Sequence, residues 1–209
     1  DPADAGEILL AGKPISPSSV QQAQELGIST VYQEINLCPN LSVAENIFIG
    51  RFPIRHGIID WKKLERDAAQ ALAALNVEID VSLPLASYPV AIQQMVAIAR
   101  ALGTDARILV LDEPTSSLDE DEVARLFAAL RALKAKGIAI LFVTHFLDQT
   151  YAISDRITVL RNGELVGEYP VDQLPRLALI EKMVGRAIDE SAFARAAGEE
   201  ASDEPAETL

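Results

Sequence analysis

The chain has 209 residues, 49% of them hydrophobic, enough for one domain with a sizeable core or for one domain with a subdomain. Its net charge of −13 argues against a nucleic-acid-binding surface, because phosphate contacts need clustered Lys and Arg. A single cysteine, Cys38, excludes an intrachain disulfide and a thiolate zinc cluster. No apolar run approaches the roughly 18–20 residues of a membrane span, and the acidic N-terminus is unlike a signal peptide, so we expect a soluble intracellular protein.

The N-terminal half of the chain predicts two short strands and then a helical block. The strands are expected over residues 8–10 and 28–32, which are rich in β-forming side chains. Three helix signals follow: a capping box at Ser42, an N-cap at Asp60 and an apolar face over residues 93–102. The second helix is expected to bury one face, formed by Trp61, Leu64, Ala68, Leu72 and Leu75. We therefore expect residues 41–105 to form a mostly helical subdomain.

A strand–helix–strand unit comes next. Residues 108–111 are a continuous apolar run, as expected of a strand that is covered on both faces of a parallel sheet. A helix is predicted from Asp119 to Lys136, with Gly137 ending it, and residues 138–143 predict a second buried strand. The core face of that helix is expected to hold Val123, Phe127, Leu130 and Leu133. This order implies a right-handed βαβ crossover.

The C-terminal part predicts a hairpin, a short helix and a tail. Residues 157–160 and 164–166 read as strands joined through Asn162-Gly163, a strong two-residue turn signal. A closing helix is suggested by Leu174, Leu177 and Ile180. Residues 187–209 hold seven acids against one Arg, a net charge of −6, and are expected to be a disordered tail or linker that follows a domain over residues 1–186.

Polar side chains stand where three predicted strands end. Asp112 and Glu113 follow the apolar run 108–111, at the end of a strand where α/β sheets bind ligands. Two adjacent acids repel each other, so a hard cation such as Mg²⁺ on one and a water-polarising task for the other would explain both. An ordinary solvated strand-to-turn junction is the alternative.

Two further strands end in the same way. His145 follows the strand over 138–143 and could hydrogen-bond a terminal phosphate, although a structural histidine is the alternative. Gln33 ends the strand over 28–32 and could ligate a metal or a water, although Gln is also common at surfaces. Polar groups at the ends of three strands together favour a functional site more strongly than any one of them does by itself.

These segments, in this order and spacing, resemble the ATP-binding-cassette (ABC) ATPases. Residues 31–37 (Val-Tyr-Gln-Glu-Ile-Asn-Leu) resemble the glutamine loop of that family. Residues 109–119 resemble the Walker B strand and D-loop, and residues 143–148 resemble the switch-histidine loop. The match runs from about Gly6 to Arg186. Three finer matches resemble the first of two tandem cassettes in bacterial ribose/galactose/xylose-type sugar importers: residues 41–47, 93–96 and 183–186.

The resemblance implies an α/β fold of the P-loop NTPase type, with a mainly parallel sheet and an inserted helical subdomain. It implies ATP and Mg²⁺ as cofactors, with Asp112 holding the metal, Glu113 acting as general base and His145 contacting the γ-phosphate. Gln33 would sense the metal and contact the membrane subunit. Asp119 would meet a partner cassette, and it would contribute to nucleotide binding together with Val90, Ala91 and Gln93, which lie in or directly after the position of the family's signature segment.

Two departures from the family pattern stand out. No Gly-x-x-x-x-Gly-Lys-Ser/Thr loop occurs in the chain, and the family places this loop roughly one to two dozen residues before Gly6. We therefore expect an N-terminally truncated cassette that lacks Walker A and binds ATP very weakly by itself. The signature segment is also altered, to residues 88–92 (Tyr-Pro-Val-Ala-Ile), in which Pro89 offers neither a hydroxyl nor an N–H.

The leading hypothesis is therefore an ATPase half that powers sugar uptake from the inner face of the bacterial membrane. Its expected partners are a second cassette, transmembrane permease subunits and, indirectly, a periplasmic sugar-binding protein, with no nucleic acid. Two alternatives stay open: a non-catalytic regulatory or structural cassette, and a soluble ABC ATPase not tied to transport. The transported solute is not encoded in these residues.

Overall fold

The computed structural model describes residues 5–33, 36–103 and 106–187. The chain divides into two compact units, residues 1–145 and 146–209, and each is described by itself. None of the helices within these described ranges is both long enough and apolar enough to cross a membrane.

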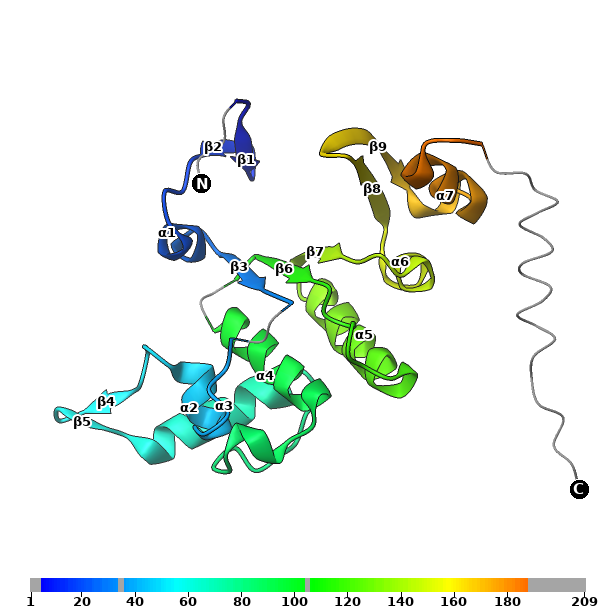
Figure 1. Ribbon diagram of the computed structural model, residues 1–209. Helices are drawn as coiled ribbons and strands as arrows, with labels where there is room; N and C mark the ends of the chain where they lie inside the picture. Colours follow the sequence, from blue (N-terminus) through cyan, green and yellow to red (C-terminus); the bar gives the residue numbers. More distant parts are fainter. Residues whose placement is uncertain (1–4, 34–35, 104–105, 188–209) are drawn as a thin grey trace, which may run out of the picture. The chain divides into compact units, whose positions relative to one another are not determined.

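A parallel sheet of three strands organises the first unit. The strands are β3 (Ile28–Val31), β6 (Ile108–Asp112) and β7 (Ala139–Val143), in the spatial order β3-β6-β7 (Figure 1). All pairs are parallel, so the three carboxyl ends lie at one edge of the sheet. The helix α5 (Glu120–Ala135) connects β6 to β7 and begins with a capping box formed by Asp119 and Glu122. The predicted strand–helix–strand unit is confirmed.

The packing of this sheet is one-sided in the described residues. Leu109 and Leu111 of β6 are fully buried, and Phe127 of α5 packs edge-on against Phe142 of β7 with ring centroids 5.8 Å apart. On β7, however, Leu141 and Val143 are exposed, so the prediction that residues 138–143 form a second buried strand is wrong. The physical reason is that β7 is an outer strand of the described sheet and α5 covers only one of its faces.

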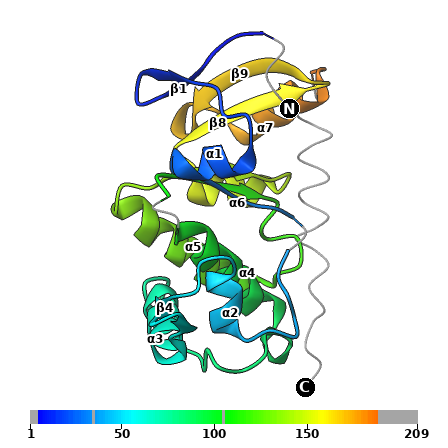
Figure 2. The same cartoon turned by 90° about the vertical axis from the view of Figure 1, so that its left-hand side faces the viewer.

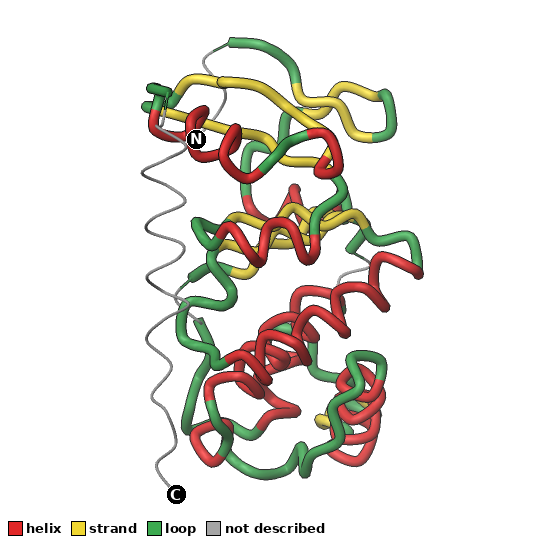
Figure 3. The backbone as a smooth tube through the Cα atoms, turned by 90° about the vertical axis from the view of Figure 1, so that its right-hand side faces the viewer, coloured by secondary structure: helices red, strands yellow, loops and turns green. Residues whose placement is uncertain are grey.

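Three helices pack together as the predicted helical block. They are α2 (Val43–Phe48), α3 (Trp61–Ala73) and α4 (Val90–Leu102), which contact one another (Figures 2 and 3). The predicted capping box at Ser42 and N-cap at Asp60 are both present. Trp61 is 49% exposed, so its predicted burial is wrong: as the first residue of α3 it precedes the buried face made by Leu64, Ala68 and Leu72.

Three details of this block went beyond the sequence prediction. The helix α4 begins three residues earlier than predicted, at Val90, because Pro89 has a φ of −64° that suits the start of a helix. A two-stranded hairpin, β4 (Ile54–Arg55) and β5 (Ile58–Ile59), lies between α2 and α3. The short 3-10 helix η1 (Leu85–Ser87) precedes α4.

The N-terminal segment adds a small hairpin and a helix to the first unit. The strands β1 (Ile8–Leu10) and β2 (Lys13–Ile15) pair antiparallel around a turn at Ala11-Gly12. The helix α1 (Val20–Glu25), which was not predicted, is capped by the Ser19 side chain and contacts β3.

The second unit is a hairpin packed on two helices. Its elements are α6 (Leu147–Ile153), β8 (Arg156–Arg161), β9 (Glu164–Pro170), η2 (Val171–Gln173) and α7 (Arg176–Val184). The Asn162-Gly163 turn has φ values of 52° and 80°, as a two-residue turn of this kind requires, which confirms the predicted hairpin. The core holds Ile157, Val159, Leu174 and Leu179. Most of the predicted tail, residues 188–209, lies outside the described residues.

Candidate functional site

Glu113 joins side chains from the ends of all three parallel strands. The Gln33 amide nitrogen, just beyond β3, donates to one Glu113 carboxylate oxygen at 3.3 Å. The other carboxylate oxygen lies 3.1 Å from Nδ1 of His145, which follows β7. Gln33 and His145 are 80 and 32 residues from Glu113 in the sequence, so the parallel register alone brings them together.

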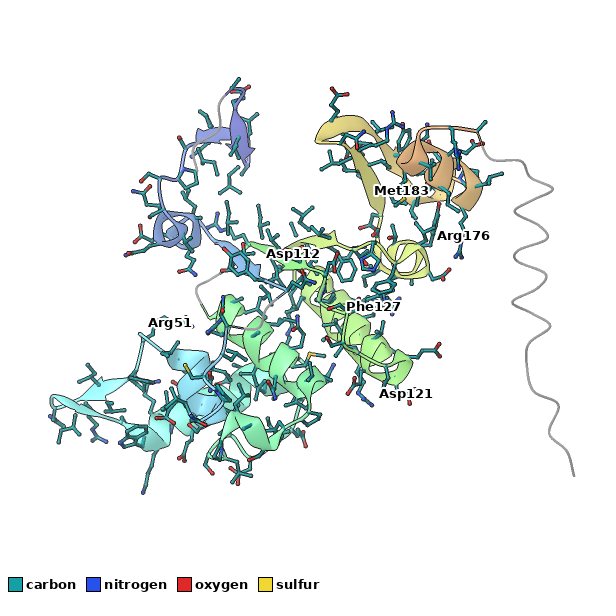
Figure 4. The ribbon with its side chains drawn as sticks, in the orientation of Figure 1. Arg51, Asp112, Asp121, Phe127, Arg176 and Met183 are labelled. Carbon is teal, nitrogen blue, oxygen red and sulfur yellow. The ribbon has the colours of Figure 1, made fainter. Side chains whose placement is uncertain are left out.

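The backbone fixes Glu113 in an unusual conformation. Asp112 is the last residue of β6 and pairs with Val143, and the Glu113 N–H extends this ladder by donating to the Val143 carbonyl at 2.9 Å. Glu113 nevertheless has a φ of 44°, in the left-handed region that costs a non-glycine residue on the order of 1–2 kcal/mol. Residues with such backbone strain cluster at active sites and ligand-binding sites, where the surrounding structure holds them in place. The chain therefore turns sharply at the sheet edge, directly after Asp112 (Figure 4).

The cluster is accessible to solvent. The side chains of Glu113 and His145 are both partly exposed, so their contact contributes little to folding stability. What the contact does is orient the carboxylate: both of its oxygens are engaged by neighbouring side chains, and the group faces the sheet edge where parallel α/β sheets bind ligands. A fixed, accessible carboxylate of this kind can accept a proton from a water molecule.

The residues at this edge fit a hard cation of the Mg²⁺ type. Asp112 offers a half-buried carboxylate, and Gln33 keeps a carboxamide oxygen as an acceptor while its nitrogen donates to Glu113. Oxygen donors of this kind suit Mg²⁺, which is usually held by one or two carboxylates together with substrate phosphates. Among the described residues, no group of three or more His, Cys, Asp or Glu side chains converges to form a metal cage by itself.

The other predicted site residues lie elsewhere in the first unit. Asp119 caps α5, where its carboxylate accepts from the Glu122 N–H at 2.8 Å. Val90, Ala91 and Gln93 form the first turns of α4, in the helical block (Figure 1). The exposed Val90 and the buried Ala91 follow Pro89, which gives the helix no side-chain cap. The roles predicted for these residues remain predictions.

Sequence reasoning missed an arginine that ties the helical block together. Arg51 donates to the carbonyls of Ile47 and Arg100 at 3.0 Å each and to that of Gly103, so it satisfies the C-terminal carbonyls of α4. Burial lowers its pKa from the ordinary value. Arg51 and Arg100 also line a cavity of about 1410 Å³ between α1, β3 and α4. No local pattern could have predicted this, because the contact spans about fifty residues of sequence.

Similar solved structures define the class of fold. The cassette MJ1267 in its ADP conformation superposes with a TM-score of 0.72 at 24% identity, over 87% of this chain and 76% of that one. A dimeric cassette in a post-hydrolysis state, bound to ADP and Pi, gives 0.66 at 24% identity, over 82% and 75%. The chain therefore has the α/β fold of an ATP-binding cassette, as predicted.

The family follows from the sequence comparison. The profile of the ABC transporter family matches residues 1–116, more than half of the chain, and the chain belongs to this family. It is 50% identical over 203 residues to the galactofuranose transporter ATP-binding protein YtfR of Escherichia coli, covering 97% of this chain and 41% of the relative. The fructose import ATP-binding protein FruK of Bifidobacterium longum is 50% identical over 188 residues, covering 90% and 37%. The chain thus spans about two fifths of the length of these relatives.

Proposed function

We propose that the chain is part of the ATP-binding subunit of a bacterial sugar importer. The observation that carries the ATPase part of this proposal is the Glu113 carboxylate, which Gln33 and His145 hold at the ends of three parallel strands. The relatives support the sugar class, because their names specify galactofuranose, fructose and ribose. Since three different sugars appear among relatives of similar identity, the solute itself is not assigned.

In the proposed mechanism, Glu113 accepts a proton from the water that attacks the γ-phosphate of ATP, while the bond from the γ-phosphorus to the bridging oxygen breaks and ADP leaves. His145 orients Glu113 from one side and contacts the γ-phosphate, while Gln33 orients it from the other. Asp112 and the Gln33 carboxamide oxygen would hold Mg²⁺, which neutralises charge on the phosphate oxygens when bound. The chain's own contribution is to place a carboxylate, an imidazole and an amide around one reacting centre.

The proposed partners follow from this assignment. A second cassette would share the nucleotide, and the dimeric solved cassette bound to ADP and Pi supports a paired arrangement. Asp119 and the first turn of α4, with Val90, Ala91 and Gln93, would face that second cassette. Transmembrane permease subunits would hold the protein at the cytoplasmic face of the membrane, and a periplasmic sugar-binding protein would deliver the solute from the other side.

One observation favours a second candidate, a non-catalytic cassette that docks partners without turnover. The first turn of α4 begins at Pro89, which provides no N–H and no capping side chain at a position where a helix N-terminus could bind phosphate. The intact cluster of Gln33, Glu113 and His145 favours the catalytic assignment over this one.

Glu113→Gln separates the two candidates. In the full-length protein, the amide keeps the shape of the side chain but cannot act as a base, so we expect nucleotide affinity to change little while ATP hydrolysis falls by about 100-fold or more. Glu120→Gln makes the same charge change on the exposed first turn of α5 and serves as the matched control, with hydrolysis near the parent rate. Equal hydrolysis by the parent and Glu113→Gln would refute the assignment of the base and favour the non-catalytic cassette.

A further inference from the structure

The hairpin β4–β5 projects from the helical block (Figure 1). Its turn is His56-Gly57, with φ values of 53° and 79°, so two residues reverse the chain. Ile54 pairs with Ile59, and Arg55 pairs with Ile58. Because successive strand residues point to opposite faces, Ile54 lies on one face of the hairpin and Ile58 on the other.

Both of these isoleucines are presented to solvent. Ile54 and Ile58 are each 72% exposed, more than any other large apolar side chain in the part of the chain that the structure describes. A flat protein surface that docked against one face of the hairpin would cover only one of them. Insertion of the tip into an apolar medium would cover both at once.

An aromatic pair stands at the base of the hairpin. Trp61 is 49% exposed, and its ring lies 6.5 Å from that of Phe52, centroid to centroid, at the two ends of the hairpin segment. Trp is favoured at the boundary between an apolar phase and water, where its ring is buried and its N–H stays wet. From tip to base, the segment therefore carries the His56-Gly57 turn, then the isoleucines together with Arg55, and then the aromatic pair.

The charge of this segment is opposite to that of the chain. Residues 51–63 contain four Arg or Lys and one Asp, a net charge of +3 in a chain of net charge −13. Arg55 and Lys62 are exposed beside the isoleucines and the tryptophan. Basic side chains beside exposed apolar ones are typical of segments that bind the headgroups of anionic lipids.

We infer that the β4–β5 hairpin inserts its tip into the headgroup region of an anionic lipid bilayer. Ile54 and Ile58 reach the apolar boundary and Trp61 lies at the interface. Arg55, which pairs with Ile58, extends its long side chain back to the lipid phosphates, and Lys62 contacts them near the base of the hairpin. Those acidic side chains that lie more than a Debye length of about 10 Å from the hairpin are largely screened and do not prevent this. The net negative charge of the rest of the chain does restrict the orientation of approach, because the hairpin must reach the bilayer before the acidic surfaces do.

The lone tryptophan of the chain makes the inference directly testable. Vesicles of phosphatidylglycerol and phosphatidylcholine are titrated into the 209-residue chain while Trp61 emission is followed. The expected result is a blue shift with the anionic vesicles, little shift with phosphatidylcholine alone, and reversal by high salt. Unchanged emission at the highest anionic lipid concentration overturns the inference. A shift that requires vesicles carrying a permease, and not lipid alone, overturns it in favour of a protein partner.

A matched pair of double variants identifies the surface. Ile54→Ser with Ile58→Ser is expected to weaken vesicle binding by about tenfold or more, since apolar area no longer leaves water. Leu160→Ser with Leu165→Ser is the control, because these leucines are 67% and 66% exposed and flank the two-residue turn of the other hairpin, β8–β9. The control is expected to bind as the parent does. Equal loss in both double variants, or no loss in the first, overturns the assignment to β4–β5.

The electrostatic part has its own variant. Arg55→Gln with Lys62→Gln is expected to lower binding to anionic vesicles by roughly fivefold per charge removed and to flatten its salt dependence. An unchanged salt dependence overturns the role given to these two cations. All of the substituted side chains are exposed, so the thermal unfolding of each variant is expected to match that of the parent.

Discussion

Asn46 holds in place the loop over residues 38–41, which leads into α2. The side chain is 1% exposed, and the two hydrogens of its amide nitrogen are donated to the carbonyls of Cys38 and Ser42, at 2.9 Å each, with the Leu41 carbonyl at 3.3 Å sharing one of them. Its oxygen accepts from the Cys38 N–H at 2.7 Å. We expect that removing this side chain destabilises the block more than any surface substitution.

The magnitude follows from these four contacts. Each hydrogen bond contributes about 0.5–1.5 kcal/mol net, and Asn46→Ala also removes the side-chain partner of the Cys38 N–H, whereas the three carbonyls keep their backbone donors. We expect a loss of about 3 kcal/mol in the free energy of unfolding. Asn46→Asp keeps the volume but places a carboxylate oxygen against three carbonyl oxygens, so it is expected to cost more than the alanine.

Urea unfolding followed by Trp61 fluorescence measures this loss, because the single tryptophan lies in the same helical block. Asn40→Ala is the control: Asn40 is exposed in the same loop, and its substitution is expected to change stability by less than about 0.5 kcal/mol. If Asn46→Ala unfolds at the same urea concentration as Asn40→Ala, or if Asn46→Asp matches the parent, the account of Asn46 as a hydrogen-bonding hub is wrong.

Two further predictions concern α4 and the second unit. Pro89 has φ and ψ of −64° and 162°, almost the values of −61° and 160° at Ser42, whose hydroxyl caps α2. A serine at position 89 could cap α4 in the same way, so Pro89→Ser should be about 1 kcal/mol more stable than Pro89→Ala. Equal melting temperatures of the two variants would show that no cap forms. The Tyr151 hydroxyl donates to the Leu174 carbonyl at 2.7 Å, and burial raises the pKa of Tyr151. The contribution of the Tyr151 hydroxyl to the free energy of unfolding is therefore complete below the unfolded pKa of about 10 and is lost as the pH rises through the folded pKa. In denaturant titrations, the stability advantage of the parent over Tyr151→Phe should shrink above pH 10. A constant advantage would show that ionisation of the phenol is not coupled to folding.

Local features of this protein were predictable from the sequence. The capping box at Ser42, the N-cap at Asp60 and the Asn162-Gly163 turn act over two to four residues, and all three are present as predicted. The strand that ends at Asp112 was predictable as well, because a short apolar run that stops at two acids is compatible with few structures other than a buried strand. Motif order then sufficed to indicate the cassette fold.

Only the tertiary structure decided how distant residues meet. The contacts of Glu113 with Gln33 and His145 depend on the register of β3, β6 and β7, which no local pattern specifies. Helical spacing likewise placed Trp61 on a buried face, whereas the structure leaves it half exposed at the base of a hairpin that the periodicity did not reveal. The physical reason is common to both: short-range signals fix the conformation of neighbouring residues, while burial and side-chain contacts depend on which elements pack together across the chain.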